Sequence, residues 1–156
     1  MIPKIGMSEI NLKKSTNLLT VILSDEMALY IKTRKFHWNV AGESFMELHK
    51  LFESEYIAIE IIVDEVAERI NKLGQKTIGT MNEFTLLTRI IEHPNQYPAR
   101  KVMISELLSD HELLIAELRK DIDICSNDNH DVGTADLLTG ILQQHESIAW
   151  TLRRYL

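Results

Sequence analysis

Apolar residues recur along this chain at mixed three- and four-residue spacing, in four long segments. This pattern predicts helices that each bury one face. The first segment runs from about Asn11 to His37, and the second from about Ser44 to Leu73, where Gly74 suits a helix C-terminus. The third begins near Ala99, and the last begins near Thr134, a residue type that caps helix N-termini.

Residues that interrupt helices lie in the connections between these segments. A shorter helix is expected after Asn82, and Pro94 and Pro98 break the pattern that follows it. The polar stretch Ser126 to Gly133 is expected to be a loop. No strand pattern is visible. The sequence therefore predicts an all-α fold, a four-helix bundle with a short extra helix between the second and third long helices.

Length and composition narrow the class of protein. The 156 residues suit a single domain, 1–156, in which residues 1–10 are expected to form a flexible N-terminal segment. A formal net charge of -6 argues against a broadly basic nucleic-acid surface and is compatible with attracting cations. The single cysteine, Cys125, excludes an intrachain disulfide and suits a reducing cytosol. No apolar run is long enough for a signal peptide or a membrane span, so a cytoplasmic protein is expected.

Candidate metal ligands share one face of the second helix. His49 and Glu53 are four residues apart, as are Asp64 and Glu68, and this spacing puts each pair on one helix face. With His49 at zero on a helical wheel, the other three lie at about 40°, 60° and 100°. Imidazole with carboxylate suits a transition metal such as iron. The alternative is that these residues are ordinary solvated side chains.

The separation of the two ligand pairs along the helix decides whether one chain can bind a metal ion with both. His49 and Asp64 are 15 positions apart in the sequence, or roughly 22 Å along a helix, so one chain cannot bring both pairs to one metal. If two copies of the helix pack antiparallel about a two-fold axis, position n meets about position 117 − n. The His49/Glu53 pair then faces the Asp64/Glu68 pair of the other copy, twice per dimer. His37 is placed to complete each site, and no histidine has the Glu-x-x-His spacing of a single-bundle di-iron site.

These residues resemble a known family. The segments His37-Trp38-Asn39-Val40, Leu48-His49 and Asp64 to Ile70, with Gly42 and Phe45, are similar in identity and spacing to the signature of the Dps (DNA-protection-during-starvation) family. That family consists of ferritin-like mini-cage proteins, and the resemblance extends over nearly the whole chain. It implies a ferritin-like bundle, twelve subunits around a hollow cavity, and ferroxidase centres shared by two-fold related subunits.

The resemblance also assigns roles to residues. It implies that His37, His49 and Glu53 of one subunit and Asp64 and Glu68 of its neighbour bind two iron ions. The expected function is oxidation of Fe(II), with hydrogen peroxide as oxidant, and storage of ferric mineral, which protects the cell from oxidative damage. The family often has Asp where this chain has Glu53, so the reach of this carboxylate differs by one methylene.

Two further features leave alternatives open. Asp121, Asp123, Asp128 and Asp131 flank a turn; they are either solvated residues or, by resemblance, the lining of an iron-entry pore. The alternative function is a non-enzymatic, DNA-binding protein of the nucleoid, in which Lys4, Lys13 and Lys14 would form a basic tail. The acidic net charge favours weak or no DNA binding. A metal-free structural bundle is the third reading.

Overall fold

The computed structural model describes residues 3–156. Residues 1 and 2, which belong to the predicted flexible segment, lie outside the described part. The described residues contain no strand and form α1 (Glu9–Asn39), α2 (Phe45–Lys72), α3 (Met81–Leu87), α4 (Arg100–Asp123), the π-helical turn η1 (Ile124–Asp128) and α5 (Val132–Arg153). The predicted all-α bundle with a short extra helix is confirmed.

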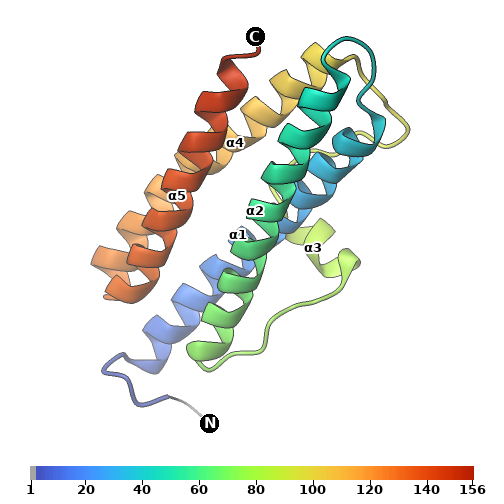
Figure 1. The fold of residues 1–156 in the computed structure, drawn as a ribbon. Helices are drawn as coiled ribbons and strands as arrows, with labels where there is room; N and C mark the ends of the chain where they lie inside the picture. Colours follow the sequence, from blue (N-terminus) through green and yellow to red (C-terminus); the bar gives the residue numbers. More distant parts are fainter. Residues whose placement is uncertain (1–2) are drawn as a thin grey trace.

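The four long helices form two antiparallel pairs (Figure 1). α1 packs chiefly on α2, and α4 packs chiefly on α5. The short helix α3 lies against α1, within the long connection that carries the chain from α2 back to the start of α4. It begins with a capping box, in which Thr80 and Glu83 bind each other's backbone N–H groups. Among residues 3–156, no helix is long and apolar enough to cross a membrane.

The core consists of two apolar clusters stacked along the bundle. One cluster surrounds Leu19, Ile62 and Leu138, and the other surrounds Leu29, Phe52 and Leu107. These side chains are 0% exposed, and full burial of each contributes about 1.5–3 kcal/mol. The α2 members of the core lie on the helix face opposite the predicted metal ligands, so the ligand face remains outside the bundle.

Two helices begin two residues before their approximate predicted starts, because side chains cap them earlier than the apolar pattern suggests. α1 begins at Glu9, where the Ser8 hydroxyl accepts from the backbone N–H of Asn11, so the last residues of the expected flexible segment are helical. α5 begins at Val132, and its N-cap is Asp131, which accepts from the backbone N–H of Thr134. Thr134 itself is therefore inside the helix.

The prediction of a loop at residues 126–133 was also largely wrong, because most of these residues are helical. α4 continues into η1, where the N–H of Asn129 bonds the carbonyl of Ile124 at 3.0 Å. Polar residues on the exposed side of a continuing helix have the same composition as a loop, so the sequence pattern could not separate the two. The prediction that Gly74 ends α2 is confirmed. Gly74 has φ 90, and its N–H and that of Gln75 bond the last carbonyls of the helix.

Candidate metal centre

The turn between α1 and α2 brings two predicted ligands, His37 and His49, into direct contact. His37 lies in the last turn of α1, and His49 lies near the start of α2. The two imidazole rings stack with their centroids 3.7 Å apart and 20° between their planes. The connection between the helices is short and turns through Gly42 (φ 90) and Ser44 (φ 60), both in the left-handed region.

Each of these imidazoles is held by the backbone of the other. Nδ1 of His37 lies 2.7 Å from the carbonyl oxygen of His49, and Nδ1 of His49 lies 2.9 Å from the carbonyl oxygen of His37. A carbonyl oxygen only accepts, so each Nδ1 carries a proton and donates it. In the neutral rings, both Nε2 atoms therefore keep a lone pair. This is the tautomer that a metal ion requires.

Aromatic rings enclose the stacked pair on both sides. Phe45 lies against His49 with centroids 5.2 Å apart, and Tyr56 meets His37 edge-on at 5.3 Å. Tyr56 is not among the predicted site residues. The helical wheel carries a signal for it, because Tyr56 falls at about −20° from His49, next to the arc of ligands. Packing on both sides restricts ring rotation and fixes where the two Nε2 atoms point.

The three predicted carboxylate ligands, Glu53, Asp64 and Glu68, are all exposed on α2. The Lys72 ammonium donates to Glu68 at 2.8 Å, and this hydrogen bond holds the pKa of the Glu68 carboxyl below its usual range. α2 is one continuous helix, so His49 and Asp64 are separated by roughly 22 Å of helix rise. Within residues 3–156, no three His, Cys, Asp or Glu side chains are grouped closely enough to hold one metal ion.

One chain thus presents two separate half-sites, with exposed apolar residues between them. Ile57 is 47% exposed and Ile61 is 55% exposed. On the wheel they lie at about 80° and 120°, next to the ligands. Large apolar side chains exposed together on one helix face are typical of a protein interface. The geometry suits a second copy that covers this strip and supplies the missing ligands.

The four acids predicted to line a pore separate into two groups. Asp123 and Asp128 are exposed. Asp131 and Asp121 are buried, and each forms an ion pair with an arginine of the same chain, at 2.9 Å and 3.7 Å. The buried pair thus already has partners in the chain. The pore stays a prediction, and its accessible candidates are Asp123 and Asp128.

A buried polar network joins α1, α4 and α5 across the bundle. His145 on α5 bonds Glu26 on α1 at 2.8 Å through Nε2, and bonds Nδ1 of His111 on α4 at 2.8 Å through Nδ1. All three residues are 0% exposed. Neither histidine is among the predicted metal ligands. Both lie on the apolar stripe of their helices, which is the signal that could have shown their burial.

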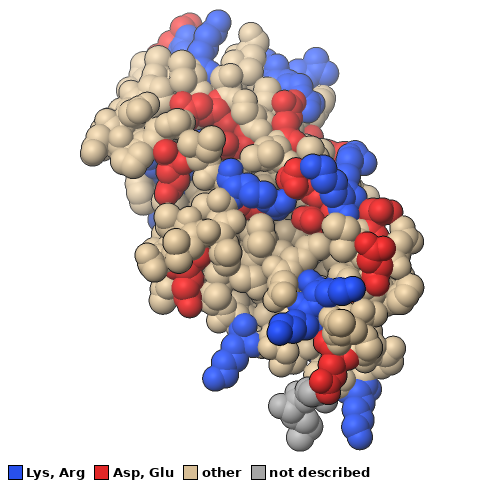
Figure 2. Space-filling model, turned by 180° about the vertical axis from the view of Figure 1, so that it is seen from behind, with Lys and Arg blue, Asp and Glu red and all other residues tan. Residues whose placement is uncertain are grey.

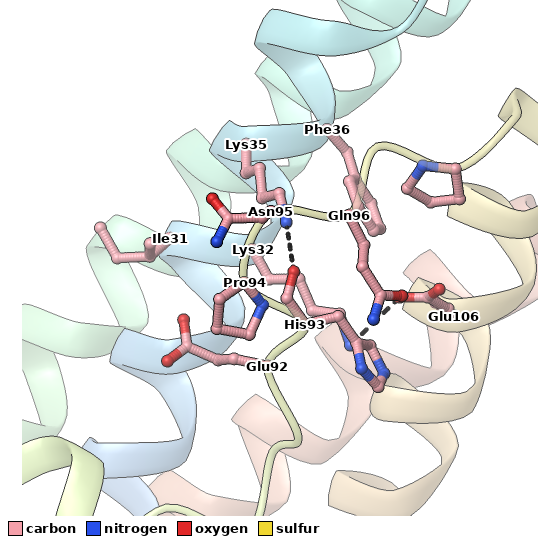
Figure 3. A pocket seen from close by; sticks show the side chains of 11 residues that line it. Ile31, Lys32, Lys35, Phe36, Glu92, His93, Pro94, Asn95, Gln96 and Glu106 are labelled. Carbon is pink, nitrogen blue, oxygen red and sulfur yellow. Dashed lines mark hydrogen bonds and ion pairs between the residues drawn. The ribbon is translucent and has the colours of Figure 1, made fainter.

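A pocket of about 280 Å³ lies between α1 and the segment before α4, away from the predicted ligands (Figure 3). Its lining includes Lys32, Lys35 and His93. Lys35 donates to the carbonyl of His93 at 2.8 Å, and the Lys32 ammonium lies 2.6 Å from Asp110. Both ammonium groups therefore already have acceptors, and none of the predicted metal ligands lines the pocket.

Comparison with known proteins gives matches over most of the chain. A family model described as a ferritin-like domain matches residues 16–156. An uncharacterised low-temperature-induced protein of Nostoc sp. is 40% identical over 152 residues, which are 97% of this chain and 85% of the relative. DNA protection during starvation protein 2 of Bacillus anthracis is 35% identical over 144 residues, which are 92% of this chain and 97% of the relative.

Solved structures agree with these matches. DpsC from Streptomyces coelicolor superposes with a TM-score of 0.95 at 27% identity, covering 99% of this chain and 90% of that chain. A Dps protein from Vibrio cholerae O1, described as a member of a broad superfamily of ferritin-like diiron-carboxylate proteins, superposes with a TM-score of 0.91 at 26% identity. That alignment covers 99% of this chain and 96% of the other, so the likeness extends over the complete fold.

Proposed function

This chain belongs to the Dps family of ferritin-like proteins, and from that membership we propose that pairs of chains bind and oxidise Fe(II) at sites they share. The observation that carries the proposal is the reciprocal lock between His37 and His49, which leaves two Nε2 lone pairs fixed and available. Iron is the substrate of this reaction.

The proposed site divides its ligands between two chains. His37, His49 and Glu53 come from one chain, and Asp64 and Glu68 come from the partner. Imidazole nitrogen favours Fe(II), and the hard carboxylate oxygens stabilise Fe(III), so the mixed set suits both states of the substrate. The ligand face lies outside the bundle, so a dimer can form the site without opening either core.

Two irons held side by side can reduce hydrogen peroxide without releasing a radical. One Fe(II) gives hydrogen peroxide a single electron and leaves a hydroxyl radical. Two Fe(II) ions give both electrons: 2 Fe²⁺ + H₂O₂ + 2 H⁺ → 2 Fe³⁺ + 2 H₂O. The ferric product then hydrolyses and collects as mineral inside a closed assembly, for which we propose twelve chains in the cytoplasm. The protein in this way protects the cell from oxidative damage.

Stoichiometry tests this proposal directly. A dimer with two sites and two irons at each site binds two Fe(II) per chain. Anaerobic titration of the assembled protein with Fe(II), followed by hydrogen peroxide, is expected to show a break at two Fe(II) per chain. One peroxide should be consumed for every two irons. A ratio of one peroxide per iron, with radical trapped by a spin probe, would contradict a paired site.

Iron entry gives a second test. Replacing Asp123 and Asp128 by Asn is expected to slow iron uptake several-fold at low Fe(II) concentration, because a ring of carboxylates raises the local cation concentration. Assembly should be unchanged, since both side chains are exposed. Glu65→Gln, which alters an exposed acid on α2 far from this turn, is the matched control. Equal uptake rates in all three proteins would remove Asp123 and Asp128 from the entry path.

DNA binding is not part of the proposal. Lys13 and Lys14 lie in the first turns of α1 rather than in a free tail. Figure 2 shows acidic and basic side chains interspersed over the face it presents. The net charge is -6 per chain. Nucleic-acid binding of this electrostatic kind would require a continuous basic surface.

A further inference from the structure

Arg34 on α1 is a cation held among aromatic rings beside the candidate metal centre. Its guanidinium carbon lies 4.9 Å from the ring centroid of Tyr56, 5.2 Å from that of Trp38 and 5.4 Å from that of Tyr30. One Nη donates to the Tyr30 hydroxyl at 2.5 Å. Tyr56 in turn contacts the ring of His37. The charge of Arg34 is thus one ring away from a predicted iron ligand.

This guanidinium forms no ion pair with the described residues of its own chain, and Glu60 of the same chain acts on it only at longer range. No ion pair among residues 3–156 involves Arg34. Its Nε is buried and makes no hydrogen bond in the described part of the chain. Aromatic faces attract a cation, but they do not neutralise it. If a second copy covers this surface, Arg34 loses water as well, and an uncompensated buried charge is costly.

The register of the proposed dimer places a carboxylate at this position. In the antiparallel packing, position 60 meets position 117 − 60 = 57, and Ile57 directly follows Tyr56. Glu60 lies at about 20° on the α2 wheel, inside the arc of the metal ligands, so it faces the partner as they do. Within the described residues of its own chain, Glu60 is exposed and forms no ion pair. The hydrogen bond to Tyr30 is the main cause that raises the pKa of the Arg34 guanidinium, and the charge of Glu60 reaches Arg34 and raises this pKa slightly further.

We propose that Arg34 of each chain pairs with the partner's Glu60 across the two-fold axis. The inference rests on the proposed two-chain site, because that site fixes the register. Two equivalent ion pairs would bracket the axis between the two metal centres. A slip of one helical turn along α2 would leave both cations unpaired. The pair thus acts as a register lock, which holds each set of histidines opposite the correct carboxylates.

Reversing the charges one at a time gives a test that separates partner contacts from contacts within a chain. In Arg34→Glu homodimers, glutamate faces glutamate across the axis, and in Glu60→Arg homodimers, arginine faces arginine. Each variant alone is expected to dimerise at least about tenfold more weakly than wild type. A mixture of the two variants has only opposite charges across the axis and should assemble again. Pairing within one chain predicts no recovery in that mixture.

The measurement is assembled mass by light scattering, with different tags on the two variants to count each chain. The expected result is a 1:1 assembly from the mixture and little assembly from either variant alone. Glu65→Arg, on an exposed acid outside the ligand arc, should assemble like wild type. Normal assembly of both single variants, or folded helical chains that stay apart when mixed, would overturn the inference. If a variant does not fold alone, co-expression must still give the 1:1 assembly, and its absence counts against the lock.

The outcomes also separate this inference from the proposed function. Unimpaired single variants, in a protein whose wild type oxidises iron at shared sites, would remove the register lock alone. A wild-type protein that remains monomeric while it oxidises iron would remove both.

Discussion

Chains that carry Asp64→Asn together with Glu68→Gln are expected to oxidise Fe(II) at least about 100-fold more slowly than wild type. Loss of residues that merely support a metal ligand already costs 10–100-fold, and these changes remove both anionic ligands that one chain donates to its partner's site. Amides keep the shape of the side chains and lose their charge. Stopped-flow absorbance after addition of Fe(II) and hydrogen peroxide measures the rate.

Stability and assembly should be nearly unchanged in this variant. Both side chains are exposed, and the only ion pair lost among residues 3–156 is the surface contact between Glu68 and Lys72, which solvent screens. The matched control is Glu65→Gln, an exposed acid next to Asp64 that points away from the ligand arc. A wild-type rate in the doubly substituted protein would show that these carboxylates are ordinary solvated residues.

Acid is expected to destabilise the bundle through His111. Burial lowers the pKa of His111 well below its usual value near 6.5, and the charge of His145 lowers it further. The unfolded chain takes up a proton at this residue near pH 6.5, and the folded chain does not. The stability tied to His111 is therefore present above pH 6.5 and is lost as pH falls below it, by up to about 1.4 kcal/mol per pH unit.

A non-titrating side chain isolates this contribution. Between pH 6.5 and pH 5, wild type is expected to lose more unfolding free energy than His111→Gln, by on the order of 1 kcal/mol. Glutamine keeps a hydrogen-bonding group beside His145 but takes up no proton. Urea unfolding followed by circular dichroism, at one protein concentration, gives both curves. Parallel pH profiles would show that His111 does not control acid stability.

The helical period of the sequence predicts both the fold, which is confirmed, and the candidate ligand face, which stays a prediction. A face of α2 that carries Glu53, Asp64 and Glu68 cannot also be a core face, so a single helical period revealed both the burial and the candidate chemistry. The sequence predicts only that His37 lies near His49. It does not predict that the two rings stack on each other. The reciprocal hydrogen bonds that set their tautomers depend on backbone carbonyl positions, which no residue pattern records.

Three other features could not be predicted from the pattern of apolar and polar residues, for physical reasons. Asp131 takes over the N-cap role predicted for Thr134, and both residue types are good caps, so only the local backbone decides between them. The π-helical turn at Ile124–Asp128 has the composition of a loop. The aromatic rings around the Arg34 guanidinium come from both α1 and α2. This arrangement can be predicted only when the relative rotation of the two helices is known.

The most direct measurement of the central claim mixes two inactive proteins. One carries His37→Ala with His49→Ala, and the other carries Asp64→Ala with Glu68→Ala; each alone lacks half of the ligands at every site. In a mixed dimer, one site receives both defects and the other receives intact ligands from each chain. After refolding together, random pairing is expected to restore roughly a quarter of the wild-type rate of Fe(II) oxidation. Activity that stays at the level of the parents, in mixtures proven to contain both chains, would contradict a shared site.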